Sequence, residues 1–208
     1  MATVIHRHIF LIVLLIITII AIPTILVIAS ADEPCQSAQY GEDKPAAIQV
    51  SWAYAYGSFE ELSKASDLIA VGRIEKIDSV TSVPVGLKTE EGEPRIYFTQ
   101  YLFKIETVLK GEKVEQVIVN QTGAGNEQIV TDDPLYSVGE TYVMFLREYE
   151  PGKYYTLGGP QGRYLIGDDG TISSMNRIYA DQVIIPMALD IENWPKDSFI
   201  KTIADITD

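Results

Sequence analysis

Histidine and cysteine, which commonly act as bases, nucleophiles and metal ligands, are scarce in this sequence. The two histidines, His6 and His8, precede a long apolar run, and Cys35 is the only thiol. The chain after that run therefore has no imidazole for a Ser-His-Asp or Cys-His arrangement and no ligand set for a structural zinc site. A single cysteine also excludes an intrachain disulfide and CxxC redox chemistry. We expect neither a metal nor another cofactor.

Adjacent carboxylates are the remaining candidates for catalysis. Glycosidase-type acid–base chemistry needs two carboxyl groups about 5–10 Å apart across a cleft. Neighbours on a strand point to opposite faces, and such pairs in turns are expected to face water. We therefore expect a protein that is not an enzyme, with a His-independent carboxylate hydrolase as the alternative. The adjacent pairs are Glu60-Glu61, Glu90-Glu91, Asp132-Asp133 and Asp168-Asp169, the last of which precedes Gly170 as in a hairpin turn.

Two segments have the composition of a binding surface. Trp52, Tyr54 and Tyr56 share one face if residues 50–56 are extended. Such a row of rings can stack on a sugar, bind a partner peptide, or pack the N-terminal segment onto the fold. A polar, glycine-containing loop, residues 123–126, lacks the helix and the Lys-Ser/Thr pair of a phosphate loop. The candidate partner-binding residues are Trp52, Tyr54, Tyr56, Gly123, Gly125 and Asn126.

An uncharged stretch from Ile9 to Ile28 is long enough to cross a membrane as a helix. At about 1.5 Å per residue it spans the roughly 30 Å hydrocarbon core. Arg7 precedes it and Asp32 follows it, so the positive-inside rule places the N-terminus in the cytoplasm. Ala29-Ser30-Ala31 resembles a signal-peptidase site, whereas the length of the run favours a retained anchor. In both cases the remainder of the chain is expected to be extracytoplasmic.

The chain is strongly acidic, with a formal net charge of −13. This charge repels phosphate backbones and anionic lipid, so we expect no nucleic-acid partner and membrane contact only through the N-terminal segment. Metal cations and basic protein surfaces remain candidates as partners. The composition, 47% hydrophobic and 22% charged, is that of a folded globular protein.

The pattern along the chain predicts three segments: residues 1–31 as signal peptide or signal anchor, residues 32–48 as a polar linker, and residues 49–208 as one domain. Ser58 and Glu61 form a capping box for a short helix that ends near Ala65. Near the C-terminus, Asp197 is the predicted N-cap of a second helix. Its predicted apolar face consists of Phe199, Ile203 and Ile206.

Short strands separated by turn residues are predicted between these two helices. The segment Tyr142–Leu146 is apolar on both faces and is expected to be central in a sheet. Many short strands with only terminal helices favour a small barrel or a sandwich. The predicted strands include residues 68–77, 101–109, 117–119, 142–146, 154–157 and 163–166.

The runs ASDLIAVGRIEKI, YLFKIETVLKG, VIVNQTG, YSVGETYVMFLRE and YYTLGGPQGRYLIGDDG follow one another between Ala65 and Ile172. This order resembles prokaryotic exported domains of uncharacterised function, whose strand order is similar to the OB-type barrel of netrin-like and tissue-metalloproteinase-inhibitor-like modules. The resemblance implies a mainly β fold: a small OB-like antiparallel barrel with a short N-terminal helix and a C-terminal helix, preceded by one membrane-targeting helix. Such inhibitors bind zinc through an N-terminal cysteine and contain disulfides, and neither feature carries over to Cys35.

The sequence thus predicts a non-catalytic, extracytoplasmic binding module of the cell envelope that recognises a protein or peptide partner. The alternatives are the carboxylate hydrolase and a structural envelope spacer. A deep pocket lined by two or more carboxylates would favour the hydrolase. An exposed patch at Trp52 or at residues 123–126 would favour binding.

Overall fold

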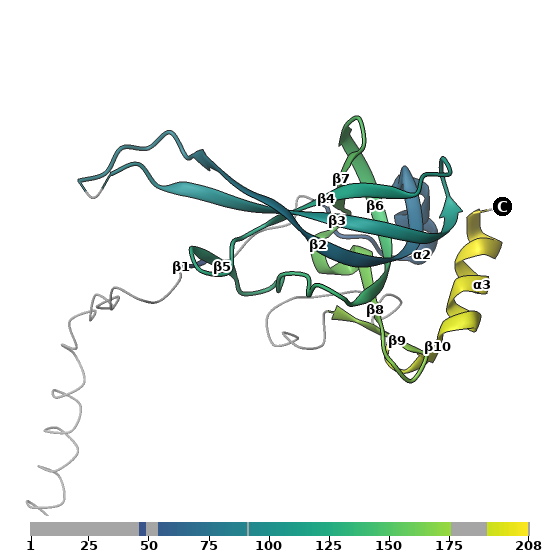
Figure 1. The fold of residues 1–208 in the computed structure, drawn as a ribbon. Helices are drawn as coiled ribbons and strands as arrows, with labels where there is room; N and C mark the ends of the chain where they lie inside the picture. Colours follow the sequence, from purple (N-terminus) through teal and green to yellow (C-terminus); the bar gives the residue numbers. More distant parts are fainter. Residues whose placement is uncertain (1–45, 49–53, 91, 176–190, 208) are drawn as a thin grey trace, which may run out of the picture. The chain divides into compact units, whose positions relative to one another are not determined.

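The computed structural model describes residues 46–48, 54–90, 92–175 and 191–207 (Figure 1). The apolar run at residues 9–28, Cys35, Trp52 and most of the predicted linker lie outside the described residues. No helix within the described part is long and apolar enough to span a membrane. The segment Lys44–Asp208 forms a compact unit of its own.

About half of the described chain is β-strand and its only α-helices are two short ones, which confirms the predicted mainly β class. The strands are β1 (Ala46–Ile48), β2 (Leu68–Pro84), β3 (Arg95–Lys110), β4 (Gln116–Thr122), β5 (Gln128–Val130), β6 (Thr141–Glu150), β7 (Lys153–Thr156), β8 (Arg163–Ile166), β9 (Thr171–Ser174) and β10 (Trp194–Pro195). Eight of them form one sheet in the order β10-β9-β8-β6-β2-β3-β4-β7. The predicted central position of residues 142–146 is confirmed, because β6 pairs with β2 on one side and with β8 and β7 on the other.

Five strands of this sheet pair in a closed circuit. β2 pairs with β3, β3 with β4, β4 with β7, β7 with β6, and β6 again with β2. The β4–β7 pairing is parallel and the other four are antiparallel. The strands of the circuit contribute fully buried aromatic and apolar side chains to one core, among them Tyr101, Phe103, Val119, Tyr142 and Met144.

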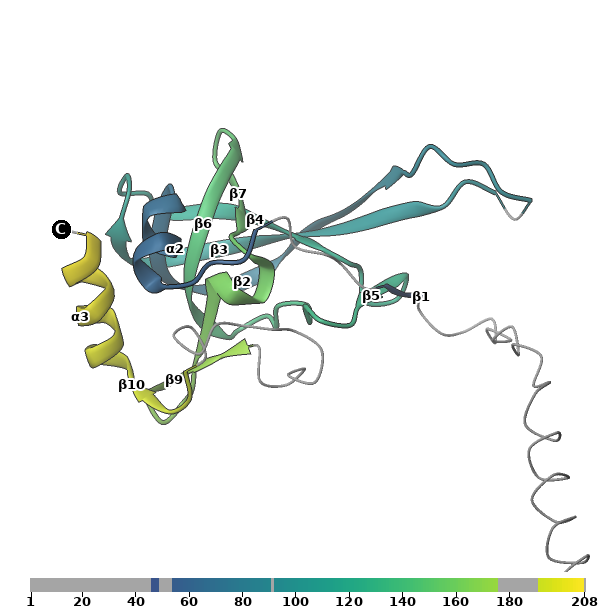
Figure 2. The same cartoon turned by 180° about the vertical axis from the view of Figure 1, so that it is seen from behind.

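A second core lies between the sheet and two helices. The helices α2 (Phe59–Ala65) and α3 (Lys196–Thr207) lie side by side, as Figures 1 and 2 show. The predicted N-cap bond is confirmed, because the hydroxyl of Ser58 accepts a hydrogen bond from the Glu61 N–H at 3.3 Å. The Glu61 carboxylate accepts from the Gly57 N–H at 2.9 Å, one residue before the partner that a capping box requires. At the other end of α2, Lys110 Nζ donates to the carbonyls of Ser63 and Ser66, both at 2.7 Å. This ammonium group satisfies carbonyls that a helix end leaves unpaired.

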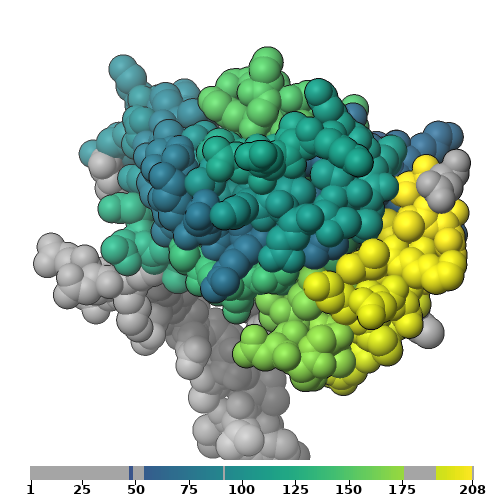
Figure 3. Space-filling view, turned by 45° about the vertical axis from the view of Figure 1, so that its right-hand side comes forward, coloured from purple at the N-terminus to yellow at the C-terminus, as the bar shows by residue number. Residues whose placement is uncertain are grey.

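The C-terminal helix begins two residues earlier than predicted. Lys196 is its first residue, so Asp197 lies in the first turn and is not the N-cap. The N–H of Lys196 donates to Gly170 O at 3.1 Å, which anchors the start of the helix beside the β8–β9 turn. The predicted apolar face is confirmed: Phe199 and Ile203 are fully buried, and Ile206 is partly buried. In the space-filling view α3 (yellow) covers one flank of the strands (Figure 3).

Two further segments differ from expectation. Residues 46–48, predicted as the end of the linker, form β1 and pair in parallel with β5. β2 and β3 also extend past the closed circuit as a long two-stranded hairpin, which the sequence did not predict at this length. We call residues 77–90 and 92–98 of this hairpin the arm, and it projects away from the circuit in Figure 1. Bulges in β2 near Ile74 and Ile77 interrupt the regular alternation that would have marked one continuous strand.

Phe199 should be essential for docking α3. Its ring is fully buried and lies 5.4 Å from Phe59, 5.2 Å from Tyr164 and 5.5 Å from Trp194. We expect Phe199→Ala to lower the free energy of unfolding by about 3–5 kcal/mol, because it removes these contacts and leaves a cavity. Urea denaturation measures the change. Ser198→Ala, at the exposed neighbouring position, should change stability by less than about 0.5 kcal/mol, and equal effects of the two variants would contradict the docking role.

Candidate functional site

A groove lined largely by tyrosines lies beside the β6–β7 hairpin. Its volume is about 250 Å³. Residues of the segment before α2 form one wall, and residues of β6, β7 and the following turn form the other. We call it the tyrosine groove, and its lining residues are Tyr54, Tyr56, Arg147, Tyr155, Thr156, Leu157 and Gly158.

A buried glutamine holds Tyr56 in this groove. The N–H of Tyr56 donates to Gln161 Oε1 at 3.1 Å, and Gln161 is buried in a short 3-10 helix, η1 (Gly159–Gly162). Gly158, just before η1, has a left-handed backbone with φ of 60°, and a Cβ there would lie 2.7 Å from Gln161 Oε1. Glycine is therefore required at position 158 for the turn that brings Gln161 to Tyr56.

The groove presents exposed rings above this buried support. Tyr56 is only 6% exposed, whereas Tyr54 is 72% exposed, with its ring centroid 5.8 Å from that of Tyr56. On the opposite wall Tyr155 is 39% exposed and lies 6.3 Å from Tyr149, which is also exposed. Arg147 faces Tyr155 directly across the β6–β7 pairing. Tyrosine and arginine are among the side chains most enriched at the positions that contribute most of the binding energy in protein interfaces.

The candidate residues Tyr54 and Tyr56 thus meet in one groove, as their spacing predicted, although only Tyr54 is exposed. Tyr56 packs the N-terminal segment onto the fold, which was the structural alternative for the row of rings. Arg147 was not among the residues predicted from the sequence. It comes from a strand about ninety residues further along the chain, and only the β6–β7 register could have pointed to it.

A second groove, of about 460 Å³, lies at the base of the arm. The candidate residues Gly125 and Asn126 line it. Gly123 does not; it is buried, and a Cβ there would lie 3.2 Å from Gln128 O. Its carbonyl accepts a hydrogen bond from Thr99 Oγ1 at 2.7 Å, so Gly123 serves to close this loop onto β3. The lining residues of this arm-base groove are Ile77, Val80, Thr99, Tyr101, Ala124, Gly125, Asn126, Glu127, Leu135 and Tyr136.

A buried ion pair lies behind the arm-base groove. Arg163 Nη2 is 2.6 Å from Asp133 Oδ1, and both side chains are almost fully removed from solvent. The guanidinium lies over the ring of Tyr136, 4.6 Å from its centroid, and donates to the carbonyl of Pro134. The expectation that Asp132-Asp133 faces water is therefore wrong for Asp133. A carboxylate at this depth is stable only beside a cation, and β8 supplies that cation from a distant part of the sequence.

Burial and this ion pair set the protonation of the surrounding groups. Burial raises the pKa of Asp133, while the neighbouring Arg163 opposes the shift. Burial also raises the pKa of Tyr136 to about 12 and that of Tyr101 to about 12. Both phenols are thus protonated at neutral pH, and the hydroxyl of Tyr136 is hydrogen-bonded to Thr156, which lines the tyrosine groove.

Neither groove is lined by a pair of carboxylates. The tyrosine groove has none in its lining, and the arm-base groove has only Glu127. Within the ranges that the structure describes, no group of three or more His, Cys, Asp or Glu residues could hold a metal ion. Asp169 accepts hydrogen bonds from the N–H and the hydroxyl of Thr171, at 2.9 and 2.7 Å, as the predicted hairpin turn requires.

No protein-family model and no curated protein matches this chain. Its most distinctive features are the tyrosine groove, the arm-base groove and the buried Asp133–Arg163 pair behind the latter.

The buried pair should be strongly coupled. We expect Asp133→Leu and Arg163→Met each to lower the free energy of unfolding by about 3–5 kcal/mol, because each leaves one buried charge without its partner. The double variant should be less destabilised than either single variant, and urea denaturation of all four proteins measures this. Single substitutions of Lys201 and Asp205, an exposed ion pair at 2.6 Å, serve as controls and should cost less than about 1 kcal/mol. Additive losses in the Asp133 and Arg163 variants would contradict the coupling.

Stability should also fall at alkaline pH. The pKa values of Tyr101 and Tyr136 are raised to about 12 from 10.0, so the folded state holds these protons more tightly than the unfolded state. Their contribution is complete below pH 10 and is lost as pH rises through about 12. Absorbance at 295 nm should show a late-titrating group of tyrosines that disappears in guanidinium chloride. A single transition near pH 10 in the folded protein would rule out this protection.

Proposed function

We propose that this chain is a non-catalytic, extracytoplasmic binding module of the cell envelope, which recognises a segment of a protein partner in the tyrosine groove. The observation that carries the proposal is the exposure of Tyr54 and Tyr155 on opposite walls of a groove that also contains Arg147. Tyrosine offers a large apolar area at a low entropic cost, and its hydroxyl can bond to a peptide backbone.

The size of the groove favours a peptide segment over a small molecule. Its volume of about 250 Å³ is below the roughly 300–1,000 Å³ of typical small-molecule pockets. A groove of this size takes one or two apolar side chains from a partner. Arg147, exposed at the same site, can donate to a peptide carbonyl or to a carboxylate.

The net charge of the chain further restricts the kind of partner segment that it can bind. The chain carries a net charge of −13. The partner segment is therefore apolar where it enters the groove and basic outside it, because basic residues gain attraction from the acidic surface. Nucleic acid, which repels such a surface, is not a partner in this proposal.

We infer that the closed circuit of strands is the OB-like barrel expected from the sequence. Numbered in chain order, the five strands of the circuit are β2, β3, β4, β6 and β7. Around the circuit the first strand pairs with the second, the second with the third, the third with the fifth, the fifth with the fourth, and the fourth with the first. The third and fifth strands are parallel. This order supports the resemblance to netrin-like and tissue-metalloproteinase-inhibitor-like modules. OB-type barrels bind ligands on their second and third strands and on the loops between strands one and two and between four and five. The corresponding loops here are the tip of the arm and the β6–β7 turn. The two strands joined by the β6–β7 turn line the tyrosine groove.

The proposed location follows from residues 9–28. They hold the module at the outer face of a membrane as a single helix with a cytoplasmic N-terminus, or direct its release after Ala31. Contact with the membrane is through this segment alone. The hydrolase alternative is less well supported, since neither groove has two carboxylates in its lining. In a pure spacer, the exposed rings of the groove would have no role.

Photo-crosslinking from the groove tests the proposal in intact cells. A photoreactive phenylalanine analogue replaces Tyr155 in the full chain, and the matched control carries it at Lys201, an exposed residue of α3. We expect one discrete crosslinked polypeptide from position 155 and none of that size from position 201. With that polypeptide purified, Tyr54→Ala and Tyr155→Ala should each weaken its binding at least about tenfold, as truncation of an interface anchor does.

Two results would contradict the proposal. If binding of the crosslinked polypeptide is unchanged in Tyr54→Ala and Tyr155→Ala, the groove is not the recognition site. If no discrete product forms from position 155 at any stage of growth, the spacer role becomes the better account. The Lys201→Ala variant, with an unchanged groove, should bind as the parent chain does.

A further inference from the structure

β2 has partner strands on both sides only along its first part. It pairs with β3 along nearly its whole length, but with β6 only over Leu68–Arg73. Ile74 then donates its N–H to Glu140 O at 3.0 Å and accepts from the Gly139 N–H at 2.8 Å. Beyond Ile74, no strand among the described residues pairs with the outer edge of β2, which continues to Pro84.

The hydrogen bonds of β3 show which main-chain groups of β2 face this open edge. Tyr97 donates its N–H to Gln128 Oε1 and accepts from the Gly123 N–H, so both of its main-chain groups point away from β2. Ser82 lies opposite Tyr97. Residues in a pair of this kind direct their polar groups away from each other, so the N–H and C=O of Ser82 face the open edge. Val80, two residues earlier without an intervening bulge, does the same.

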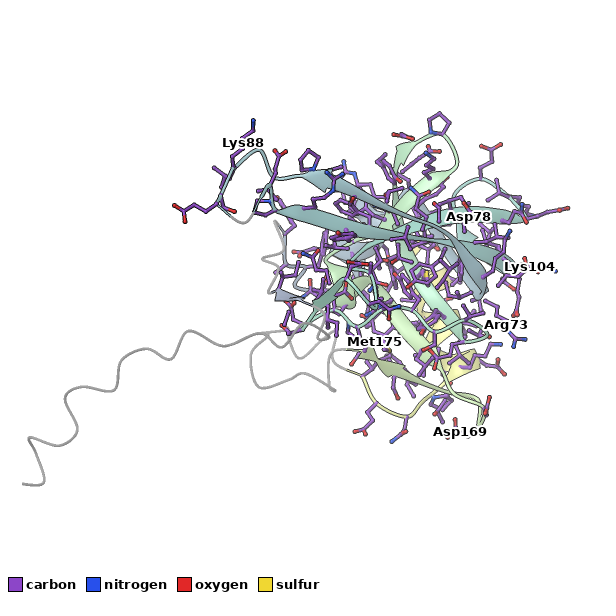
Figure 4. The ribbon with its side chains drawn as sticks, turned by 60° about the vertical axis from the view of Figure 1, so that its left-hand side comes forward. Arg73, Asp78, Lys88, Lys104, Asp169 and Met175 are labelled. Carbon is purple, nitrogen blue, oxygen red and sulfur yellow. The ribbon has the colours of Figure 1, made fainter. Side chains whose placement is uncertain are left out.

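The chain along this edge is largely apolar. The run from Ser79 to Leu87 contains no charged residue, although 22% of the chain is charged. Val80 and Val83 are 52% and 48% exposed, and Leu87 is 66% exposed. In Figure 4, Lys88 marks the far end of the arm and Asp78 its base. Natural proteins normally protect such an edge with charges or a covering element, so an uncharged apolar edge is a surface for pairing.

We propose that two copies of this chain associate through the β2 edges of their arms, antiparallel to each other, about a two-fold axis at Thr81. Val80 of one copy then lies opposite Ser82 of the other, and the two residues exchange main-chain hydrogen bonds. The two Thr81 side chains lie opposite each other on the axis. The interface is isologous, so one stretch of edge supplies both halves.

Complementary charges at the two ends of the edge favour a second copy as the occupant. Two chains with a net charge of −13 each repel through most of their surfaces, and the uncharged run lets the two edges approach. In the proposed register Asp78 lies opposite Pro84 of the second copy, and the β3 neighbour of Pro84 is Arg95. A carboxylate and a guanidinium thus come to nearby positions at each end of the interface, where opposite charges stabilise strand pairing.

Arg95 also explains how the edge is kept soluble in the single chain. Its Nε donates to Ser82 Oγ at 2.8 Å and its Nη2 donates to Ser82 O at 2.9 Å. A carbonyl oxygen has two lone pairs, so Ser82 O can accept from Arg95 and from a second copy together. Isolated two-stranded hairpins are marginally stable in water, and pairing of two arms gives a four-stranded sheet.

A lipid bilayer suits the arm less well. The exposed aliphatic side chains extend from Ile77 along β2 to Val85 and Leu87 just beyond it, and are not confined to the tip of the arm. The tip carries Glu90 and Glu93, both exposed, which oppose insertion among lipid tails. The open main-chain groups of the edge would also stay unpaired in hydrocarbon.

A disulfide placed on the two-fold axis tests the register directly. In the full chain with Cys35→Ser, Thr81→Cys should give a disulfide-linked dimer under mild oxidation. In this register the two Thr81 residues face each other without exchanging main-chain hydrogen bonds, and the Cα atoms of such a pair are about 4.5 Å apart. That distance lies within the roughly 4.4–6.8 Å that a disulfide spans. Val83→Cys is the matched control: Val83 lies opposite Ser79 of the other copy, so its thiols are too far apart. Non-reducing electrophoresis compares the two, and equal crosslinking of both variants, or none in Thr81→Cys, would overturn the proposal.

The mass of the full chain in detergent gives an independent measurement. Light scattering after gel filtration should report twice the protein mass of one chain, and Thr81→Lys should halve it, because two ammonium groups then meet on the axis. Thr107→Lys, the same change at an exposed position of β3 outside the arm, should remain dimeric. A parent chain that stays monomeric, or a dimer unaffected by Thr81→Lys, would overturn the inference. This inference does not depend on the tyrosine groove, whose variants Tyr54→Ala and Tyr155→Ala should remain dimeric.

Discussion

The pairing of β2 with two different strands is the constraint on which the rest of the fold depends. β6 pairs with the first residues of β2, and β3 pairs with nearly its whole length. β2 therefore both closes the circuit and forms the first strand of the arm. The closure requires a very close approach at Gly72, where a Cβ would lie 2.4 Å from Lys104 O and 2.8 Å from the ring of Phe103. Because alternate residues of a strand face opposite sides, β2 also supplies both cores, with Leu68 and Ala70 in one and Ile69 and Val71 in the other.

Each surface proposed for recognition lies where this closed arrangement leaves side chains or main-chain groups without cover. The tyrosine groove forms where the segment before α2 meets the β6–β7 hairpin. The open edge of the arm forms where β2 leaves β6 behind. The two proposals are compatible: one concerns a partner segment and the other a second copy, and no residue that carries one argument is used in the other. A paired module would present two tyrosine grooves, and bivalent binding gains strength without new contacts.

The buried Asp133–Arg163 pair connects the loop after β5 with β8 and supports the wall of the arm-base groove. Gln121 holds the same loop, accepting from the Tyr136 N–H at 3.0 Å and donating to Pro134 O at 2.8 Å. Such a pair is weak as a source of stability compared with apolar packing, but breaking it is costly. Its value here is geometric, because it fixes the position of Tyr136, whose ring is shared by the groove and the core.

Local patterns determined the mainly β class, the N-cap at Ser58, the turn at Asp169 and the apolar face of the C-terminal helix, because each depends on neighbours within a few residues. Membrane targeting by residues 9–28 likewise stays a prediction of the sequence. Tertiary structure alone decided the closed circuit, the length of the arm, the burial of Asp133 and the presence of Arg147 in the tyrosine groove. These features depend on strand partners and registers far apart in the chain, and a one-residue shift in register would turn every side chain to the other face.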